Sequence, residues 1–124
     1  MAKTILIADD DERVRKALCQ LFEREHDYEL SEQAKDGQEA VEFATRCRPD
    51  LVILDLEMPV KNGIEAAKGI KKILPDVPII LFTIHEEIMF NYLPIATYVD
   101  RVVMKSDIVH LLADVRDLAP IATT

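Results

Sequence analysis

Polar and charged side chains stand directly after four short apolar stretches of this 124-residue chain; they are Asp9 and Asp10, Asp55, Thr83 and Lys105. Three carboxylates in one pocket would repel one another, because two such charges ~4 Å apart cost about 4 kcal/mol at an effective dielectric near 20. A cluster of this kind raises its pKa values or binds a cation. The cluster contains oxygen ligands and no His or Cys, so the expected cation is Mg²⁺.

An aspartate beside a metal ion, a lysine and a hydroxyl group is suited to accept a phosphoryl group. The carboxylate of Asp55 would be the nucleophile. The ammonium of Lys105 would offset charge on the phosphoryl oxygens, and the hydroxyl of Thr83 would donate a hydrogen bond to one of them. The simpler alternatives are that Asp55 only begins a turn and that Lys105 is only an ion-pair partner.

This chemistry requires elements that bring the four stretches together. Residues 51–54 are all apolar and lie between turn signals, which is typical of a strand buried on both faces of a parallel sheet. By the same patterns, strands are expected over 3–8, 28–34, 51–55, 77–83 and 101–104, and helices over 12–25, about 37–46, 64–73 and 108–118. The strand over 28–34 has mixed polarity, which favours a sheet edge.

The alternation of strands and helices predicts an α/β fold, an open, doubly wound parallel sheet with helices on both faces. Ligands of such sheets bind beyond the carboxyl ends of the strands, and the strand order decides which ends are neighbours. Helical spacing also occurs within 85–100, at Ile88, Met89, Tyr92 and Leu93, where Pro94 is expected to break or kink a helix. A single domain is expected over 1–124, with its core over about 3–118.

Charge and hydropathy exclude several classes of function. Asp and Glu outnumber Lys and Arg by 23 to 15, and the net charge of −8 disfavours direct binding of nucleic acid or of an anionic membrane. No apolar run approaches the length of a membrane span. Nothing at the start resembles a signal peptide, because Asp9 follows a very short apolar stretch. A cytoplasmic protein is expected.

Five matches, taken together and in order, resemble the receiver domains of two-component response regulators. They are Ile-Leu-Ile-Ala-Asp-Asp at 5–10, Asp-Leu-Val-Ile-Leu-Asp-Leu-Glu-Met-Pro at 50–59, Asn62-Gly63, Thr83 and Lys105. Each match is weak alone, but all five in phase with the strand ends are specific. The resemblance extends from residue 3 to about 118. It implies a five-stranded, flavodoxin-like sheet with strand order 2-1-3-4-5.

The resemblance also implies a magnesium site. Asp10 corresponds to the main carboxylate ligand of Mg²⁺, and Asp9 assists directly or through water. Asp55 and the backbone carbonyl of Glu57 complete the protein ligands.

The family further implies that Asp55 accepts the phosphoryl group and that Thr83 and Lys105 contact it. The donor is a phosphohistidine on a histidine kinase or phosphotransfer protein. By the same resemblance, the chain is expected to catalyse its own phosphorylation and slow dephosphorylation without being a conventional enzyme. It signals through an output domain or a partner protein, with a possible homodimer through the fourth helix, fifth strand and fifth helix.

Three positions depart from the family pattern. Val102 stands where an aromatic residue often precedes the lysine by three positions, so Thr83 is expected to signal through packing alone. Ile84 replaces a small residue, and its bulk is expected to narrow access to the phosphoryl site. Ser106 replaces a proline, and Lys-Ser-Asp resembles regulators that have a helix-turn-helix output domain.

Two other functions remain open from the sequence. The chain is a pseudo-receiver, an interaction module that does not switch, if it fails to bind Mg²⁺. It is a small Mg²⁺-dependent phosphatase with Asp9 as nucleophile, in an Asp-x-Asp arrangement with Asp11, if ester turnover survives the loss of Asp55.

Overall fold

A computed structural model of the chain describes residues 2–91 and 95–121. Five strands form one sheet in the order β2-β1-β3-β4-β5, and every pairing is parallel. The strands are β1 (Lys3–Ala8), β2 (Tyr28–Leu30), β3 (Leu51–Leu54), β4 (Ile79–Thr83) and β5 (Arg101–Met104). The order confirms the predicted fold, with β1 and β3 near the centre of the sheet.

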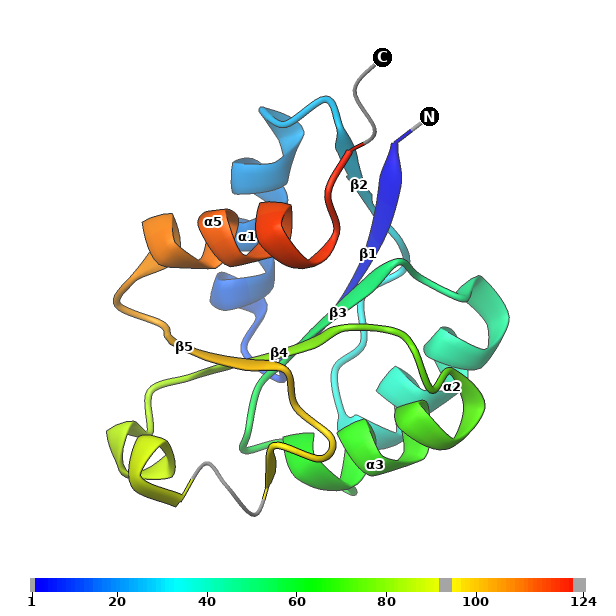
Figure 1. Cartoon of the computed structure of the whole chain (residues 1–124), viewed down its shortest axis with the longest axis vertical. Helices are drawn as coiled ribbons and strands as arrows, with labels where there is room; N and C mark the ends of the chain where they lie inside the picture. The colour runs from blue at the N-terminus through cyan, green and yellow to red at the C-terminus, as the bar shows by residue number, and fades with distance from the viewer. Residues whose placement is uncertain (1, 92–94, 122–124) are drawn as a thin grey trace.

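Helices cover both faces of this sheet (Figure 1). They are α1 (Glu12–Glu23), α2 (Gly37–Cys47), α3 (Gly63–Ile73) and α5 (Ile108–Leu118), with a short 3₁₀ helix, η1 (Glu86–Asn91), after β4. The helices α1 and α5 lie on one face, and α2 and α3 on the other. Helical spacing within 85–100 corresponds to η1 as far as Asn91; Tyr92, Leu93 and Pro94 lie outside the described residues.

Alternate strand residues supply two separate apolar cores. Leu6, Val52 and Leu81 face the helices α2 and α3. Their neighbours, such as Ile7 and Ile53, face α1 and α5. Because both faces of the central strands are covered, these strands consist almost entirely of apolar residues, as the sequence pattern predicts.

Some boundaries differ from those expected. The strand predicted over 28–34 pairs only over Tyr28–Leu30, although it does lie at the sheet edge; Ala34 returns to form a single bridge with Ala8. β4 begins at Ile79 instead of residue 77, since Pro78 has no N–H to donate to the sheet. α1 ends at Glu23 instead of residue 25.

Side-chain caps fix where the helices begin. The carboxylates of Asp11, Asp36 and Asp107 accept backbone N–H groups in the first turns of α1, α2 and α5. Asn62 and Glu65 form a reciprocal capping box at α3. Asn62, one of the residues of the family resemblance, is therefore a helix cap. Within the described ranges, the helices are all too short or too polar to cross a membrane.

Candidate functional site

The sheet register places Asp9 and Asp55 side by side. Ala8 of β1 pairs with Leu54 of β3, and the next residue on each strand is an aspartate. The backbone N–H of Asp55 donates to the carbonyl of Ala8 at 2.9 Å. Neighbouring parallel strands thus bring two of the predicted acids to the same edge of the sheet.

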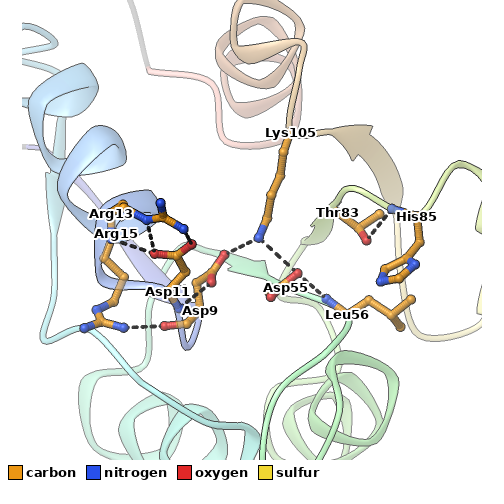
Figure 2. A network of polar contacts seen from close by, with 9 residues as sticks. All are labelled: Asp9, Asp11, Arg13, Arg15, Asp55, Leu56, Thr83, His85 and Lys105. Carbon is orange, nitrogen blue, oxygen red and sulfur yellow. Dashed lines mark hydrogen bonds and ion pairs between the residues drawn. The ribbon is translucent and has the colours of Figure 1, made fainter.

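β4 and β5 bring Thr83 and Lys105 to the same edge. Thr83 pairs with Met104, and the N–H of Lys105 donates to the carbonyl of Thr83 at 2.9 Å. Figure 2 shows Asp55 between Asp9 and Thr83, with the long side chain of Lys105 reaching the two aspartates. The residues that are far apart in the sequence therefore form one cluster at the carboxyl ends of the strands.

The loop after β3 packs tightly against the backbone of Asp55. A β-carbon at Gly63 would lie 2.2 Å from the carbonyl oxygen of Asp55, so only glycine allows this approach. The N–H of Gly63 also donates to the carbonyl of Leu56 at 2.8 Å. The pair Asn62-Gly63 therefore holds the start of α3 against Asp55.

Lys105 connects the two buried aspartates. Its Nζ lies 2.8 Å from Oδ2 of Asp9 and 3.3 Å from Oδ1 of Asp55. The other oxygen of Asp9 accepts the N–H of Asp11 at 2.9 Å. Asp9 therefore uses both carboxylate oxygens within the protein, while Lys105 divides its single charge between two acids.

Only one of the two carboxylate oxygens of Asp55 has partners within the described residues. Its Oδ1 accepts the N–H of Leu56 at 2.9 Å in addition to the contact with Lys105. Among the described residues, no hydrogen bond or ion pair reaches Oδ2. Every fully buried side-chain oxygen of the described residues has a hydrogen-bond partner. Because Oδ2 of Asp55 has none, it is not fully buried and is accessible to solvent. Asp55 thus presents one unpaired oxygen from a residue that is only 7% exposed.

The electrostatics of the site favour an added cation. Burial, and then the charge of Asp9, raise the pKa of Asp55 from 3.8 to about 6, although Lys105 opposes the shift. Burial lowers the pKa of Lys105, but its hydrogen bond to Asp9 and the charges of Asp9 and Asp55 outweigh this and raise it. The carboxylates therefore hold more negative charge than Lys105 offsets.

The acids are also close enough to share a metal ion. One carboxylate oxygen from each of Asp9, Asp10 and Asp55 lies within 4.8 Å of the others. Asp9 and Asp55 are buried, whereas Asp10 is exposed. A set of oxygen ligands with an excess of negative charge suits a hard divalent cation such as Mg²⁺. Asp11, which the phosphatase alternative required, instead caps α1 and binds the side chain of Arg13.

Lys105 lines a hollow at this edge of the sheet, whereas Thr83 lies beneath it. The hollow has a volume of about 220 Å³; it is lined by Asp9, Asp10, Asp11, Asp55, Glu57, Ile84, His85 and Lys105. Thr83 is fully buried and is not one of these lining residues. Its hydroxyl oxygen accepts the N–H of His85 at 3.1 Å, which leaves the hydroxyl hydrogen available for donation.

His85 is a member of the site that the sequence analysis did not predict. Its Nε2 lies 3.0 Å from the carboxylate of Glu57, and its Nδ1 lies 2.9 Å from that of Glu87. The hydrogen bond to Glu87 raises the pKa of His85, burial opposes this, and the charge of Glu57 adds to it. The sequence does contain a signal for this contact. Glu57 follows Asp55 by two residues and His85 follows Thr83 by two residues, so both lie at the same distance beyond the ends of neighbouring strands.

The structure shows where two of the residues that depart from the family pattern lie. Ile84 lines the hollow and is 71% exposed, so it lies at the entrance to Asp55. Val102 packs, half-buried, against the core beneath α2 and α3. Tyr98 packs against the same core with the ammonium of Lys68 over its ring. Effects of these residues on rates and on switching stay predictions.

Comparison with known proteins identifies one family. Residues 5–116 match the family model of the response regulator receiver domain. The chain is 39% identical over 79 residues to the transcriptional regulatory protein LnrK of Bacillus subtilis, which covers 64% of this chain and 36% of LnrK. It is 41% identical over 83 residues to the chemotaxis protein CheY of Halobacterium salinarum, which covers 67% of this chain and 68% of CheY. The chain thus spans about a third of LnrK and most of CheY.

Solved structures agree in fold over nearly the whole chain. The response regulator domain of Thermotoga maritima CheB superimposes with a TM-score of 0.87 at 26% identity, covering 99% of this chain and 100% of that one. The response regulator protein TrrA of Thermotoga maritima, in complex with Mg²⁺ and BeF, gives a TM-score of 0.84 at 34% identity, covering 94% and 98%.

Proposed function

Since this chain belongs to the response regulator receiver domains, we propose that Asp55 is its phospho-accepting residue. The observation that supports this most directly is the unpaired, accessible Oδ2 of Asp55 beside the ammonium of Lys105. A nucleophile needs a free electron pair, and a nearby cation offsets the charge that the phosphoryl group brings.

The phosphoryl group comes from a phosphohistidine on a histidine kinase or phosphotransfer protein. An oxygen of Asp55 attacks the phosphorus, so a P–O bond forms as the P–N bond breaks. The imidazole nitrogen of the donor keeps the electron pair of the broken bond and takes up a proton. Lys105 binds the phosphoryl oxygens through its ammonium, and the hydroxyl of Thr83 turns to donate to one of them.

Magnesium would be held by the acids of the same edge. Asp10 supplies the most exposed carboxylate, Asp9 assists directly or through water, and Asp55 and the carbonyl of Glu57 complete the set. No hydrogen bond within the described residues uses the Glu57 carbonyl, so that oxygen is available as a ligand. When bound, Mg²⁺ offsets the negative charge of the carboxylates and of the phosphoryl oxygens.

The chain acts as one receiver domain over 1–124, with its core over about 3–118, in the cytoplasm. It signals through an output domain or a partner protein. Its net charge of −8 supports a role without direct contact with nucleic acid or membrane. Phosphorylation promotes a homodimer through the helical segment between β4 and β5, through β5 and through α5. The exposed Val109 and Ile108 at the start of α5 support this surface, and light scattering with a phosphoryl mimic tests it.

Intact mass spectrometry after incubation with a small phosphodonor and Mg²⁺ tests the acceptor. Wild type gains one phosphoryl group, and Asp55→Asn gains none. Asp114→Asn is the matched control, because Asp114 is also 7% exposed but pairs with Arg101 on another face; it should gain the group as wild type does.

Other outcomes identify the alternative functions. Wild type that gains no phosphoryl group from small donors or from a phosphorylated kinase would be a pseudo-receiver. Turnover of a phosphate ester that persists in Asp55→Asn and stops in Asp9→Asn would indicate the phosphatase.

A further inference from the structure

A second hollow lies along the C-terminal half of α3, whereas Asp55 lies at the N-terminus of this helix. Its volume is about 590 Å³, and its lining residues are Lys68, Lys71, Lys72, Pro75, Thr97 and Tyr98; we call it the basic groove. α3 begins against the backbone of Asp55 and has 11 residues, so its far end is about 16 Å away. The basic groove therefore lies near the amino ends of the strands, away from the phosphoryl site.

One of the three lysines forms part of the protein framework. Nζ of Lys71 donates to the carbonyl of Val77 at 2.6 Å and to the carboxylate of Asp100 at 3.0 Å. The same carboxylate oxygen accepts the N–H of Ile79 at 2.8 Å. The side chain of Lys71 is only 17% exposed. Lys71 thus ties α3 to the start of β4 and is not available to a ligand.

The other two lysines are exposed and not neutralised. Within residues 2–91 and 95–121, no carboxylate lies within ion-pair distance of Lys68 or Lys72. Nζ of Lys68 lies 5.3 Å from the centre of the Tyr98 ring. This cation–π contact keeps the side chain at the wall of the groove while the ammonium keeps its charge. Two free ammonium groups in one groove are notable in a chain with a net charge of −8.

The spacing of these two charges suits an extended acidic peptide. Lys68 and Lys72 are four residues apart on one helix face, which places their β-carbons about 5–6 Å apart. Alternate side chains of an extended peptide point the same way and repeat every ~6.8 Å. Two carboxylates separated by one residue can therefore reach both ammonium groups. Pro75 and the ring of Tyr98 provide apolar walls for the intervening residues.

We infer that the basic groove binds an acidic, extended segment of a partner protein through Lys68 and Lys72. A nucleic acid is a poorer fit, because its duplex carries one charge per about 1.7 Å and the acidic remainder of this chain repels it. The groove is separate from Asp55, so this binding does not depend on the proposed phosphorylation.

The test is an NMR titration of the isotope-labelled full chain with a synthetic peptide of alternating Glu and Gly residues. At low ionic strength the amide signals of Lys68, Lys72 and Tyr98 should shift and saturate. The same peptide with Gln in place of Glu should have no effect. Added salt should weaken the binding, because both charges are exposed.

Charge-reversal variants locate the binding. Lys68→Glu with Lys72→Glu should weaken peptide binding at least tenfold. Arg24→Glu with Lys35→Glu, two exposed cations outside the groove, is the matched control and should retain binding. Lys68→Gln with Lys72→Gln should also lose affinity, and thermal unfolding confirms that each variant is folded.

Three results would overturn the proposal: equal affinity in the two charge-reversed variants, no shifts at the groove with millimolar peptide, or tighter binding of a single-stranded oligonucleotide. A change in molecular mass on reversing Lys68 and Lys72 would instead identify a second copy of this chain as the occupant. Phosphorylation of Asp55 is measured on the same variants. It should equal that of wild type, so a failure of the proposed function is recognised separately.

Discussion

Two lysines at opposite edges of the sheet have nearly the same exposure but different surroundings. The side chain of Lys105 is 16% exposed at the carboxyl edge, and that of Lys71 is 17% exposed at the amino edge. Lys105 contacts two carboxylates, Asp9 and Asp55. Lys71 contacts a backbone carbonyl and one carboxylate, Asp100, which is itself fixed by a backbone N–H.

The difference shows that the two lysines are distinguished by their partners and not by their burial. At the amino edge the charges and hydrogen bonds of Lys71 are matched by fixed groups. At the carboxyl edge a single ammonium faces more negative charge than it offsets, and Asp55 keeps an unpaired oxygen. The first arrangement stabilises the fold, while the second leaves room for a cation and a phosphoryl group.

The largest expected effect follows from the pKa of Asp55. It is about 6 in the folded protein and about 3.8 in the unfolded chain, so the folded state holds its proton more tightly. As the pH rises from about 4 to about 6, the unfolded state ionises first and the fold loses up to about 3 kcal/mol. Asp55→Asn should therefore raise the free energy of unfolding by about 2–3 kcal/mol at neutral pH without divalent cations, and by little near pH 4. Urea unfolding across this pH range measures it.

Asp114→Asn tests whether a paired carboxylate of equal burial behaves differently from Asp55. Asp114 is buried to the same extent as Asp55, but Arg101 lies 2.9 Å away and matches its charge. This variant should lose stability at neutral pH, because the charged pair is broken. If both asparagine variants shifted stability in the same direction, the contrast between the edges would be wrong.

Replacing Lys105 or Lys71 with methionine distinguishes an effect on phosphorylation from an effect on stability alone. Lys105→Met should slow phosphorylation of Asp55 by at least about 100-fold, because a charged group that binds the phosphoryl oxygens is lost. Lys71→Met should leave phosphorylation unchanged but destabilise the fold by about 2 kcal/mol, since the Val77 carbonyl and Asp100 lose a partner. Mass spectrometry follows the first effect and urea unfolding the second.

Magnesium provides the internal control for these two variants. Lys105→Met should also lose stability, because Asp9 and Asp55 lose the ammonium between them. Millimolar Mg²⁺ should recover this stability, since a cation bound by the acids compensates for the missing ammonium. It should recover none of the loss in Lys71→Met. Equal recovery in both variants would argue against a metal site at the carboxyl edge.

The smallest expected effect concerns backbone strain. Val60, in the loop after β3, has a φ of 69° and is 74% exposed, and the N–H of Lys61 donates to the carbonyl of Pro59 across it. A left-handed conformation costs a β-branched residue about 1–2 kcal/mol, and part of this is offset by the entropy of glycine in the unfolded chain. Val60→Gly should therefore stabilise the fold by about 1 kcal/mol in urea unfolding.

Arg48 offers the comparison at the amino edge. It also has a positive φ, of 46°, but it is unbranched and ends α2 in the usual left-handed manner. Arg48→Gly should stabilise the fold less than Val60→Gly. A slower phosphorylation of Val60→Gly would show that the strained loop also helps to position Asp55.

Much of the fold and of the site could be predicted from local patterns. The apolar run ending at Asp55 identified a doubly buried strand, and four strand ends in order identified the acids, Thr83 and Lys105 as one set. The boundaries of short elements were less predictable: the edge strand stops at Leu30, because beyond it the ladder to β1 is interrupted and resumes only as the single bridge of Ala34 with Ala8. His85 was missed as a site member, since its contact with Glu57 joins two loops that are remote in the sequence.

The strand and helix types, the acidic charge and the family to which the chain belongs all follow from the sequence alone. These depend on periodicity, composition and motif order, which are local properties. The folded arrangement was needed to show that Lys105 is shared by two acids and that Oδ2 of Asp55 is unpaired. It also showed that Lys71 is fixed, while Lys68 and Lys72 have no carboxylate within ion-pair distance among the described residues. Such differences depend on which groups from distant segments come within hydrogen-bonding distance, and that is set by the packing of the sheet and its helices.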